Sequence, residues 1–139
     1  MTLAIGGWND SQGDKYSRLV NNAKSRRKFI DHVLKFIEKH GFDGLDLDWE
    51  YPGNILTNLL LMKYFLCQAC WQTDCKEERY KDKSGFSFLV SELRERFEPR
   101  GYLLSAAVSP SKKIIDVGYD VPSLARDLDW IAVMSYDYQ

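Results

Sequence analysis

Residues 41–52 of the chain read GFDGLDLDWEYP, a stretch in which acidic and apolar side chains alternate. Successive side chains of a β-strand point to opposite faces. A strand over Gly44–Tyr51 therefore has one acidic face and one apolar face. The acidic face carries Asp46, Asp48 and Glu50, and the apolar face carries Leu45, Leu47 and Trp49. The apolar face is suited to packing beneath helices, which leaves the carboxylates on the opposite side.

The flanking sequence alternates between strand and helix patterns. Strands are predicted over Thr2–Gly7, Gly44–Tyr51, Tyr102–Ser109 and Trp130–Tyr136, helices over Ser25–His40, Ser84–Glu98 and Val121–Leu128, and a loop over Ser111–Gly118. This order predicts an α/β fold with parallel strands joined by helical crossovers. Strands this apolar suit a sheet that is covered by helices or closed into a barrel.

Length and composition narrow the class of protein. A complete (β/α)8 TIM barrel needs about 250 residues, and this chain has 139, so we predict a single partial barrel over 1–139, an interior section of a larger one. The 19 basic and 20 acidic residues give a net charge of −1, which argues against a nucleic-acid partner. No apolar run is long enough to span a membrane, and no secretory leader is visible.

Three cysteines, Cys67, Cys70 and Cys75, lie close together in the sequence. Cys70 and Cys75 can pair in an oxidising compartment, which leaves Cys67 unpaired. A zinc site is the alternative. It is disfavoured because a structural site needs four nitrogen or sulfur ligands at characteristic spacing, and the histidines are far away in the sequence.

The acidic face of the 44–51 strand is the strongest chemical signal. Carboxylates repeated every second residue lie about 6–7 Å apart, and such neighbours raise at least one pKa and share protons. In a barrel, catalytic groups gather at the C-terminal ends of the strands. We therefore expect the outermost group, Glu50, to be a proton donor. A solvated acidic edge and a divalent-cation site are the alternatives.

The pattern Asp43-x-x-Asp46-x-Asp48-x-Glu50, followed by Tyr51-Pro52, resembles the signature of glycoside hydrolase family 18, the chitinases. Three further segments resemble motifs on the third, fifth and sixth strands of that barrel. They are LAIGGW at 3–8, LSAAV at 104–108 and MSYD at 134–137. The similarity covers nearly the whole chain and is greatest to arthropod chitinases with several catalytic domains.

The resemblance implies a role for each carboxylate. Glu50 would be the general acid, and the substrate's own 2-acetamido oxygen would replace an enzyme nucleophile. Asp48 would orient the acetamido group and stabilise the oxazolinium that forms. Asp46 would share a proton with Asp48. Asp43 is an odd number of residues from Asp46 and so belongs to the opposite face of the strand. It and the adjacent Gly44 would support the start of the strand.

The resemblance also implies a set of substrate-binding residues: Tyr136, Asp137, Met134, Trp8 and Gly7. Tyr136 would bond to the acetamido carbonyl, and Asp137 would assist around the distorted sugar. Met134 reads as a core filler beside the site, and Gly7 as a point of close backbone approach. Trp8, Trp71 and Tyr138 can stack on sugar rings, although packing in the core or at the rim is an equal interpretation of each.

The activity implied is endo-hydrolysis of β-1,4-linked N-acetylglucosamine with retention of configuration, on chitin or its oligosaccharides. No metal and no organic cofactor is implied. The family also implies an extracellular location, a Cys70–Cys75 disulfide, and further chitinase or chitin-binding domains in the full-length chain. The alternatives are an endo-β-N-acetylglucosaminidase, a non-catalytic chitin-binding lectin of the same fold, and an inactive fragment. Lectins of this fold typically lack the acid, which favours the enzyme.

The stretch Gly53–Ala69 has no counterpart in the resembling enzymes. It contains an apolar cluster, Leu59–Met62, and would emerge at the mouth of the barrel directly after the predicted acid. A lid or interaction helix, a core helix and a translated intron are its three interpretations. Half a barrel has open sheet edges that favour aggregation, so we do not expect activity from this section alone.

Overall fold

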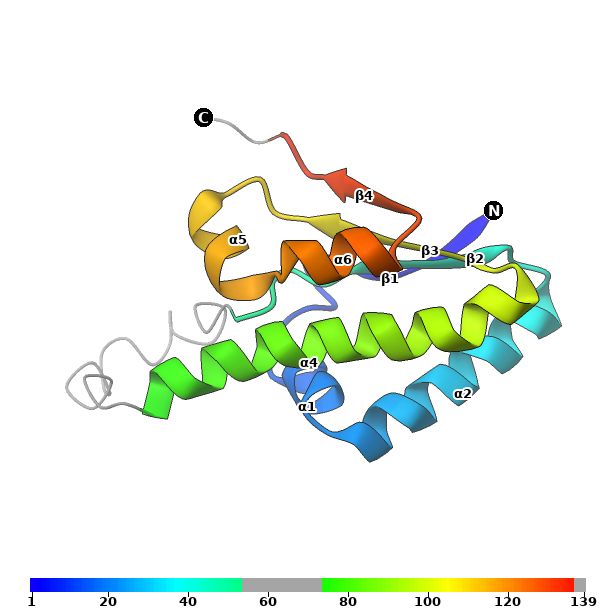
Figure 1. Ribbon diagram of the computed structural model, residues 1–139, viewed down its shortest axis with the longest axis horizontal. Coiled ribbons are helices and arrows are strands. Elements are labelled where there is room, and N and C mark those ends of the chain that lie inside the picture. Colours follow the sequence, from blue (N-terminus) through cyan, green and yellow to red (C-terminus); the bar gives the residue numbers. More distant parts are fainter. Residues whose placement is uncertain (54–73, 137–139) are drawn as a thin grey trace.

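The computed structural model describes residues 1–53 and 74–136 (Figure 1). The elements are β1 (Thr2–Gly6), α1 (Lys15–Val20), α2 (Ala23–His40), β2 (Gly44–Asp48), α4 (Asp74–Phe97), the 3-10 helix η1 (Glu98–Arg100), β3 (Leu103–Val108), α5 (Lys112–Gly118), α6 (Val121–Asp127) and β4 (Trp130–Val133). No helix within the described ranges is long and apolar enough to cross a membrane.

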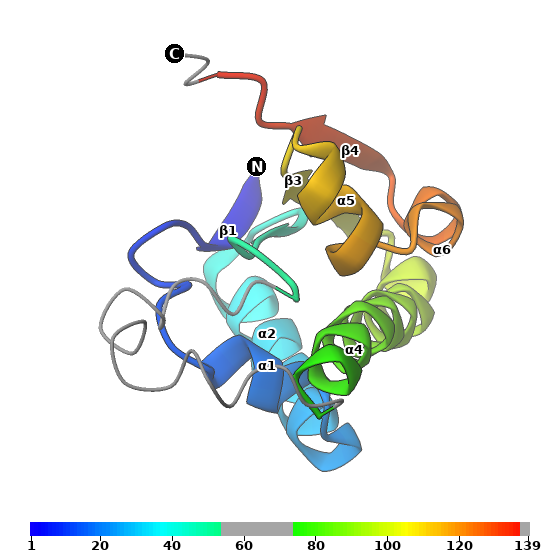
Figure 2. The same cartoon turned by 90° about the vertical axis from the view of Figure 1, so that its left-hand side faces the viewer.

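The strands form one four-stranded sheet in the order β1-β2-β3-β4. Each neighbouring pair is parallel, and the register places Gly6 beside Asp48 and Asp46 beside Ser105. Helices α1, α2 and α4 lie together on one side of this sheet (Figures 1 and 2). The predicted parallel arrangement with helical crossovers is therefore confirmed. Because all strands run the same way, their C-terminal ends meet at one edge.

The core lies between the sheet and these helices. The apolar face of the 44–51 stretch is buried, with Leu45 fully inaccessible to solvent. It meets apolar residues that recur at helical spacing on α2 and α4, namely Ile30, Val33, Leu34, Ile37, Phe86, Leu89, Val90, Leu93 and Phe97. This burial fixes the orientation of β2, because a shift of one residue would bring the carboxylates into the core.

The prediction of a loop over Ser111–Gly118 is wrong, because Lys112–Gly118 forms helix α5. Lys112 and Asp116 pair across one turn, with Nζ 2.7 Å from a carboxylate oxygen. Ile114 and Ile115 pack against the core. Packing of this kind overrides the weak helix propensity of β-branched residues.

Several element boundaries also differ from the prediction. Strand β2 ends at Asp48 instead of Tyr51, and β4 ends at Val133 instead of Tyr136. Helix α4 begins at Asp74, ten residues before the predicted Ser84, and the short helix α1 was not predicted. The early end of β2 has a direct cause. The N–H of Glu50 donates to the Ser11 hydroxyl, and the Gly7 carbonyl accepts from the Ser11 N–H, so the pairing with β1 does not continue.

Candidate active site

Asp46 is held by the neighbouring strand. The Ser105 hydroxyl donates to Asp46 Oδ1 at 2.5 Å, and Ser105 is fully buried on β3. The two residues are register partners in the parallel pair β2–β3. The sheet register therefore supplies the carboxylate with a donor that cannot move independently of it.

Asp48 lies one step further toward the C-terminal edge and is half-buried. Its Oδ1 atom is buried and has no hydrogen-bond partner among the described residues. Burial is the main cause that raises the pKa of Asp48, and the charges of Glu50 and then Asp46 raise it further. This environment favours a protonated or proton-sharing carboxyl group.

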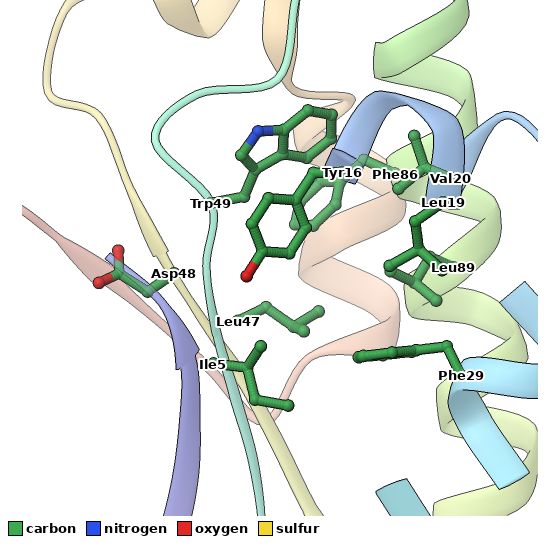
Figure 3. Close-up of a pocket in the computed structure, with 10 residues that line it drawn as sticks. All are labelled: Ile5, Tyr16, Leu19, Val20, Phe29, Leu47, Asp48, Trp49, Phe86 and Leu89. Atoms are coloured by element: carbon green, nitrogen blue, oxygen red, sulfur yellow. The ribbon is translucent and has the colours of Figure 1, made fainter. Parts of the chain in front are cut away.

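Figure 3 shows the other side of β2. Here a cavity of about 10 Å³ lies between the sheet and helices α1, α2 and α4, enough for one water at most. Its lining includes Ile5, Phe29 and Leu47, while the Asp48 carboxylate points away from it across the strand. The cavity therefore belongs to the core, and the acidic face is separated from it by the sheet.

Glu50 follows β2 and is positioned through its backbone. Its N–H donates to Ser11 Oγ at 2.9 Å, and Ser11 is buried. The Ser11 N–H in turn donates to the Gly7 carbonyl at 2.9 Å. Burial raises the pKa of Tyr51 to about 12, with contributions from the charge of Glu50 and a hydrogen bond with its side chain. Tyr51 therefore stays protonated at neutral pH as a neighbour of the Glu50 carboxylate.

The loops after β1 and β4 hold the predicted binding residues. Trp8 is 56% exposed and Tyr136 is 62% exposed. Tyr136 also makes a small contribution to the raised pKa of Tyr51. Gly7 donates to the Asp48 carbonyl at 2.7 Å. Met134 is buried but is not part of the hydrophobic core cluster.

Asp43 and Gly44 lie at the opposite end of β2. The Asp43 carbonyl accepts from the Leu103 N–H at 2.9 Å. A Cβ atom added at Gly44 would lie 2.1 Å from the Leu103 carbonyl oxygen, so only glycine permits this approach of the strands. Both residues thus act where β2 begins, away from the carboxylates.

Other predicted residues fall outside the described part of the chain: Trp71, Asp137, Tyr138, Cys67, Cys70, the side chain of Cys75, and residues 54–69 of the atypical stretch. The Cys70–Cys75 disulfide stays a prediction. Within residues 1–53 and 74–136, no three His, Cys, Asp or Glu residues are grouped as a metal site.

Two further residues of the site, Ser11 and Ser105, were not predicted as functional. Ser105 had a usable signal, because it lies in the middle of a strand pattern that pairs with the acidic strand. Ser11 had none. Its contact joins positions 39 residues apart through loops whose path the local sequence does not determine.

Parallel strands covered by helices, with carboxylates toward the carboxyl end of a strand, are consistent with part of a (β/α)8 barrel. The model of glycosyl hydrolases family 18 matches residues 1–139, and the chain belongs to this family.

Two relatives illustrate the match. Probable chitinase 10 of Drosophila melanogaster is 56% identical over 138 residues, which are 99% of this chain and 5% of that protein. Catalytic domain 2 of the Ostrinia furnacalis Group II chitinase, solved as a mutant in complex with penta-N-acetylchitooctaose, is 53% identical with a TM-score of 0.81. The match covers 99% of this chain and 32% of that one.

A third relative has a different activity. Human YKL-39, described as a pseudo-chitinase with retained chitooligosaccharide binding, is 30% identical with a TM-score of 0.74. The match covers 99% of this chain and 32% of that one. The chain thus spans about a third of the solved domains, and its strands are part of a (β/α)8 barrel.

Proposed function

We propose that the protein containing this chain is a chitinase that hydrolyses β-1,4 linkages between N-acetylglucosamine units with retention of configuration. The observation that carries the proposal is the environment of Asp48. A half-buried carboxyl group with a raised pKa lies between Asp46 and Glu50 at the edge where barrel enzymes bind substrate. The chitinases among the relatives support the same reaction.

In the proposed reaction Glu50 is the general acid. It gives its proton to the glycosidic oxygen while the acetamido oxygen of the substrate attacks the anomeric carbon. The C–O bond to the leaving sugar breaks, and an oxazolinium ion forms. The Glu50 carboxylate then takes a proton from water, whose oxygen attacks the anomeric carbon and opens the oxazolinium. Two displacements at one carbon account for the retained configuration.

Asp48 orients the acetamido group and stabilises the positive charge that develops on it. Its raised pKa means that a shared proton can stay near this group before substrate binds. Asp46 is the second holder of that proton, and the Ser105 hydroxyl at 2.5 Å steadies it. The three carboxylates therefore act as one coupled unit with different roles.

The remaining roles rest on the resemblance to the family. Exposed Tyr136 bonds to the acetamido carbonyl, Asp137 assists around the distorted sugar, and exposed Trp8 stacks on a sugar ring. We further propose endo-cleavage, an extracellular location with a Cys70–Cys75 disulfide, and further chitinase or chitin-binding domains in the full-length protein.

The test uses the complete catalytic domain that carries this chain, prepared with and without Gly53–Ala69. Release of a fluorescent leaving group from an N-acetylchitooligosaccharide is compared for the parent and for Glu50→Gln. Loss of a general acid lowers kcat by about 10²–10⁴-fold. Glu95→Gln, at an exposed position on α4, is the matched control and should retain the parent rate.

Three outcomes separate the interpretations. Hydrolysis abolished by Glu50→Gln supports the chitinase. A folded parent domain that binds chitin and never hydrolyses it would establish the lectin alternative, the activity described for human YKL-39. Hydrolysis only after removal of Gly53–Ala69 would mark that stretch as foreign to the working domain.

A further inference from the structure

Asp82 is a buried carboxylate that does not belong to the acidic face of β2. It lies on α4 and is 9% exposed. Its Oδ2 accepts from the backbone N–H of Gly53 at 3.3 Å. Its Oδ1 accepts from Asn21 Nδ2 at 2.6 Å and from the Ser17 hydroxyl. One carboxylate thus joins α1, α4 and the segment that follows Glu50.

The segment from Glu50 to Gly53 is held at both ends. Its first N–H, that of Glu50, donates to the buried Ser11 hydroxyl, and its last, that of Gly53, donates to Asp82. Helix α5 approaches its middle, since a Cβ atom at Gly118 would lie 2.6 Å from the Pro52 carbonyl oxygen. The segment is therefore fixed by groups outside the sheet.

These contacts are needed because β2 ends at Asp48. Beyond that point the backbone has no strand partner, and a buried N–H without an acceptor is costly. Asp82 supplies that acceptor from a long helix, and the two α1 donors satisfy its other oxygen. A hydrogen bond to a charged acceptor is also stronger than one to a neutral acceptor.

We infer that Asp82 is a positioning residue for the reaction: it fixes the Glu50–Gly53 segment and thereby the direction in which Glu50 delivers its proton. The inference rests on the proposed role of Glu50 as the general acid. Asp82 itself acts on α1, α4 and the loop, so its effect on catalysis passes through Glu50. A small displacement of a catalytic group is enough to lower a rate strongly.

The test is Asp82→Asn in the complete catalytic domain that retains Gly53–Ala69, because Gly53 provides the contact with Asp82. The amide has the shape of the carboxylate, but only one acceptor oxygen, so an NH2 group must face either Gly53 or the α1 donors. We expect kcat to fall at least tenfold while KM changes less than threefold, because the sugar-binding residues are untouched. The matched control is Asp14→Asn, an exposed aspartate at the start of α1 that pairs with Arg18, and it should leave both constants unchanged.

Two further variants separate positioning from simple loss of structure. Asn21→Ala removes one donor to Asp82 and leaves the Gly53 contact, so it should fold even where Asp82→Asn does not, with a smaller loss of kcat at unchanged KM. In a Glu50→Gln background, Asp82→Asn should lower kcat no further, since residues that act as a unit are not additive.

The outcomes distinguish the inference from the proposed function. An unchanged kcat in Asp82→Asn or Asn21→Ala, or a full additional loss in the Glu50→Gln background, overturns the positioning role. Full activity of Glu50→Gln by itself would instead overturn the role of Glu50 as the acid.

Discussion

Replacing Gly6 by alanine tests whether the close approach of β1 to β2 sets the position of Asp48. Gly6 has φ +120°, and an added Cβ atom would lie 2.0 Å from the Asp48 carbonyl oxygen. That oxygen also accepts the Gly7 N–H at 2.7 Å. The clash is with backbone, so a side-chain rotation cannot relieve it, and the end of β2 must move.

The expected magnitude has two parts. The unfavourable φ costs about 1–3 kcal/mol. An ordinary contact begins at 3.4 Å, so the Asp48 carbonyl must retreat by about 1.4 Å. That breaks the hydrogen bond from Gly7, which is worth about 1 kcal/mol. The free energy of unfolding should fall by about 2–4 kcal/mol. A displacement of about 1 Å in a catalytic group should lower kcat by about 10²-fold.

The assay is urea denaturation of the complete catalytic domain, followed by tryptophan fluorescence, together with the hydrolysis rate. Gly101→Ala is the matched control. Gly101 also has a positive φ, +68°, but its added Cβ would meet nothing within 4 Å. It should cost about 1–2 kcal/mol and leave kcat unchanged. The reasoning is refuted if Gly6→Ala matches Gly101→Ala in stability and keeps the full rate.

Three further substitutions test the site and the core. Asp48→Asn should raise the free energy of unfolding at neutral pH and not below pH 3.8. The pKa of Asp48 is raised in the folded state, so the folded protein loses stability as the pH rises above the pKa of the unfolded chain. Denaturation across a pH series checks this, and a gain independent of pH would contradict it. Ser105→Ala should cost about 1.5–3 kcal/mol and lower kcat, since the Asp46 carboxylate loses its donor; unchanged stability and rate would count against the contact. Arg26→Met should lower the free energy of unfolding by about 1–3 kcal/mol, because Arg26 donates to Glu92 at 2.7 Å and to a buried carbonyl. Thermal unfolding measures this loss, and kcat, measured separately, should not change.

The alternation in residues 44–51 was sufficient to predict the strand and its two faces. Leu45 and Leu47 are buried, and Asp48 lies on the other side of the strand from Leu47 (Figure 3). This worked because a period of two allows only one register with the apolar set inside. The end of the strand was not predictable from the pattern, because hydrogen bonds of Glu50 and Gly7 with Ser11 end the pairing with β1.

Short helices were the weakest part of the prediction. Helix α1 has six residues and α5 has seven, too few for a helical period to stand out, and neither begins with a proline such as the one that marks the start of α6. Their stability comes from tertiary contacts, such as the Lys83 ammonium donating to the Asp116 carbonyl at 3.0 Å. Such contacts join distant parts of the chain and leave no local trace in the sequence.

In the candidate site too, a local sequence pattern predicts some positions, and contacts between distant residues determine others. Asp46 and Asp48 lie within β2, where sheet register fixes them and a sequence pattern predicts their side. Glu50 lies beyond the strand, where Ser11 and Asp82 hold the backbone from positions far away in the sequence. The group that must deliver a proton in one direction is thus the one that the sheet does not hold. For that reason substitutions at Asp82 should separate the alignment of the acid from the stability of the barrel.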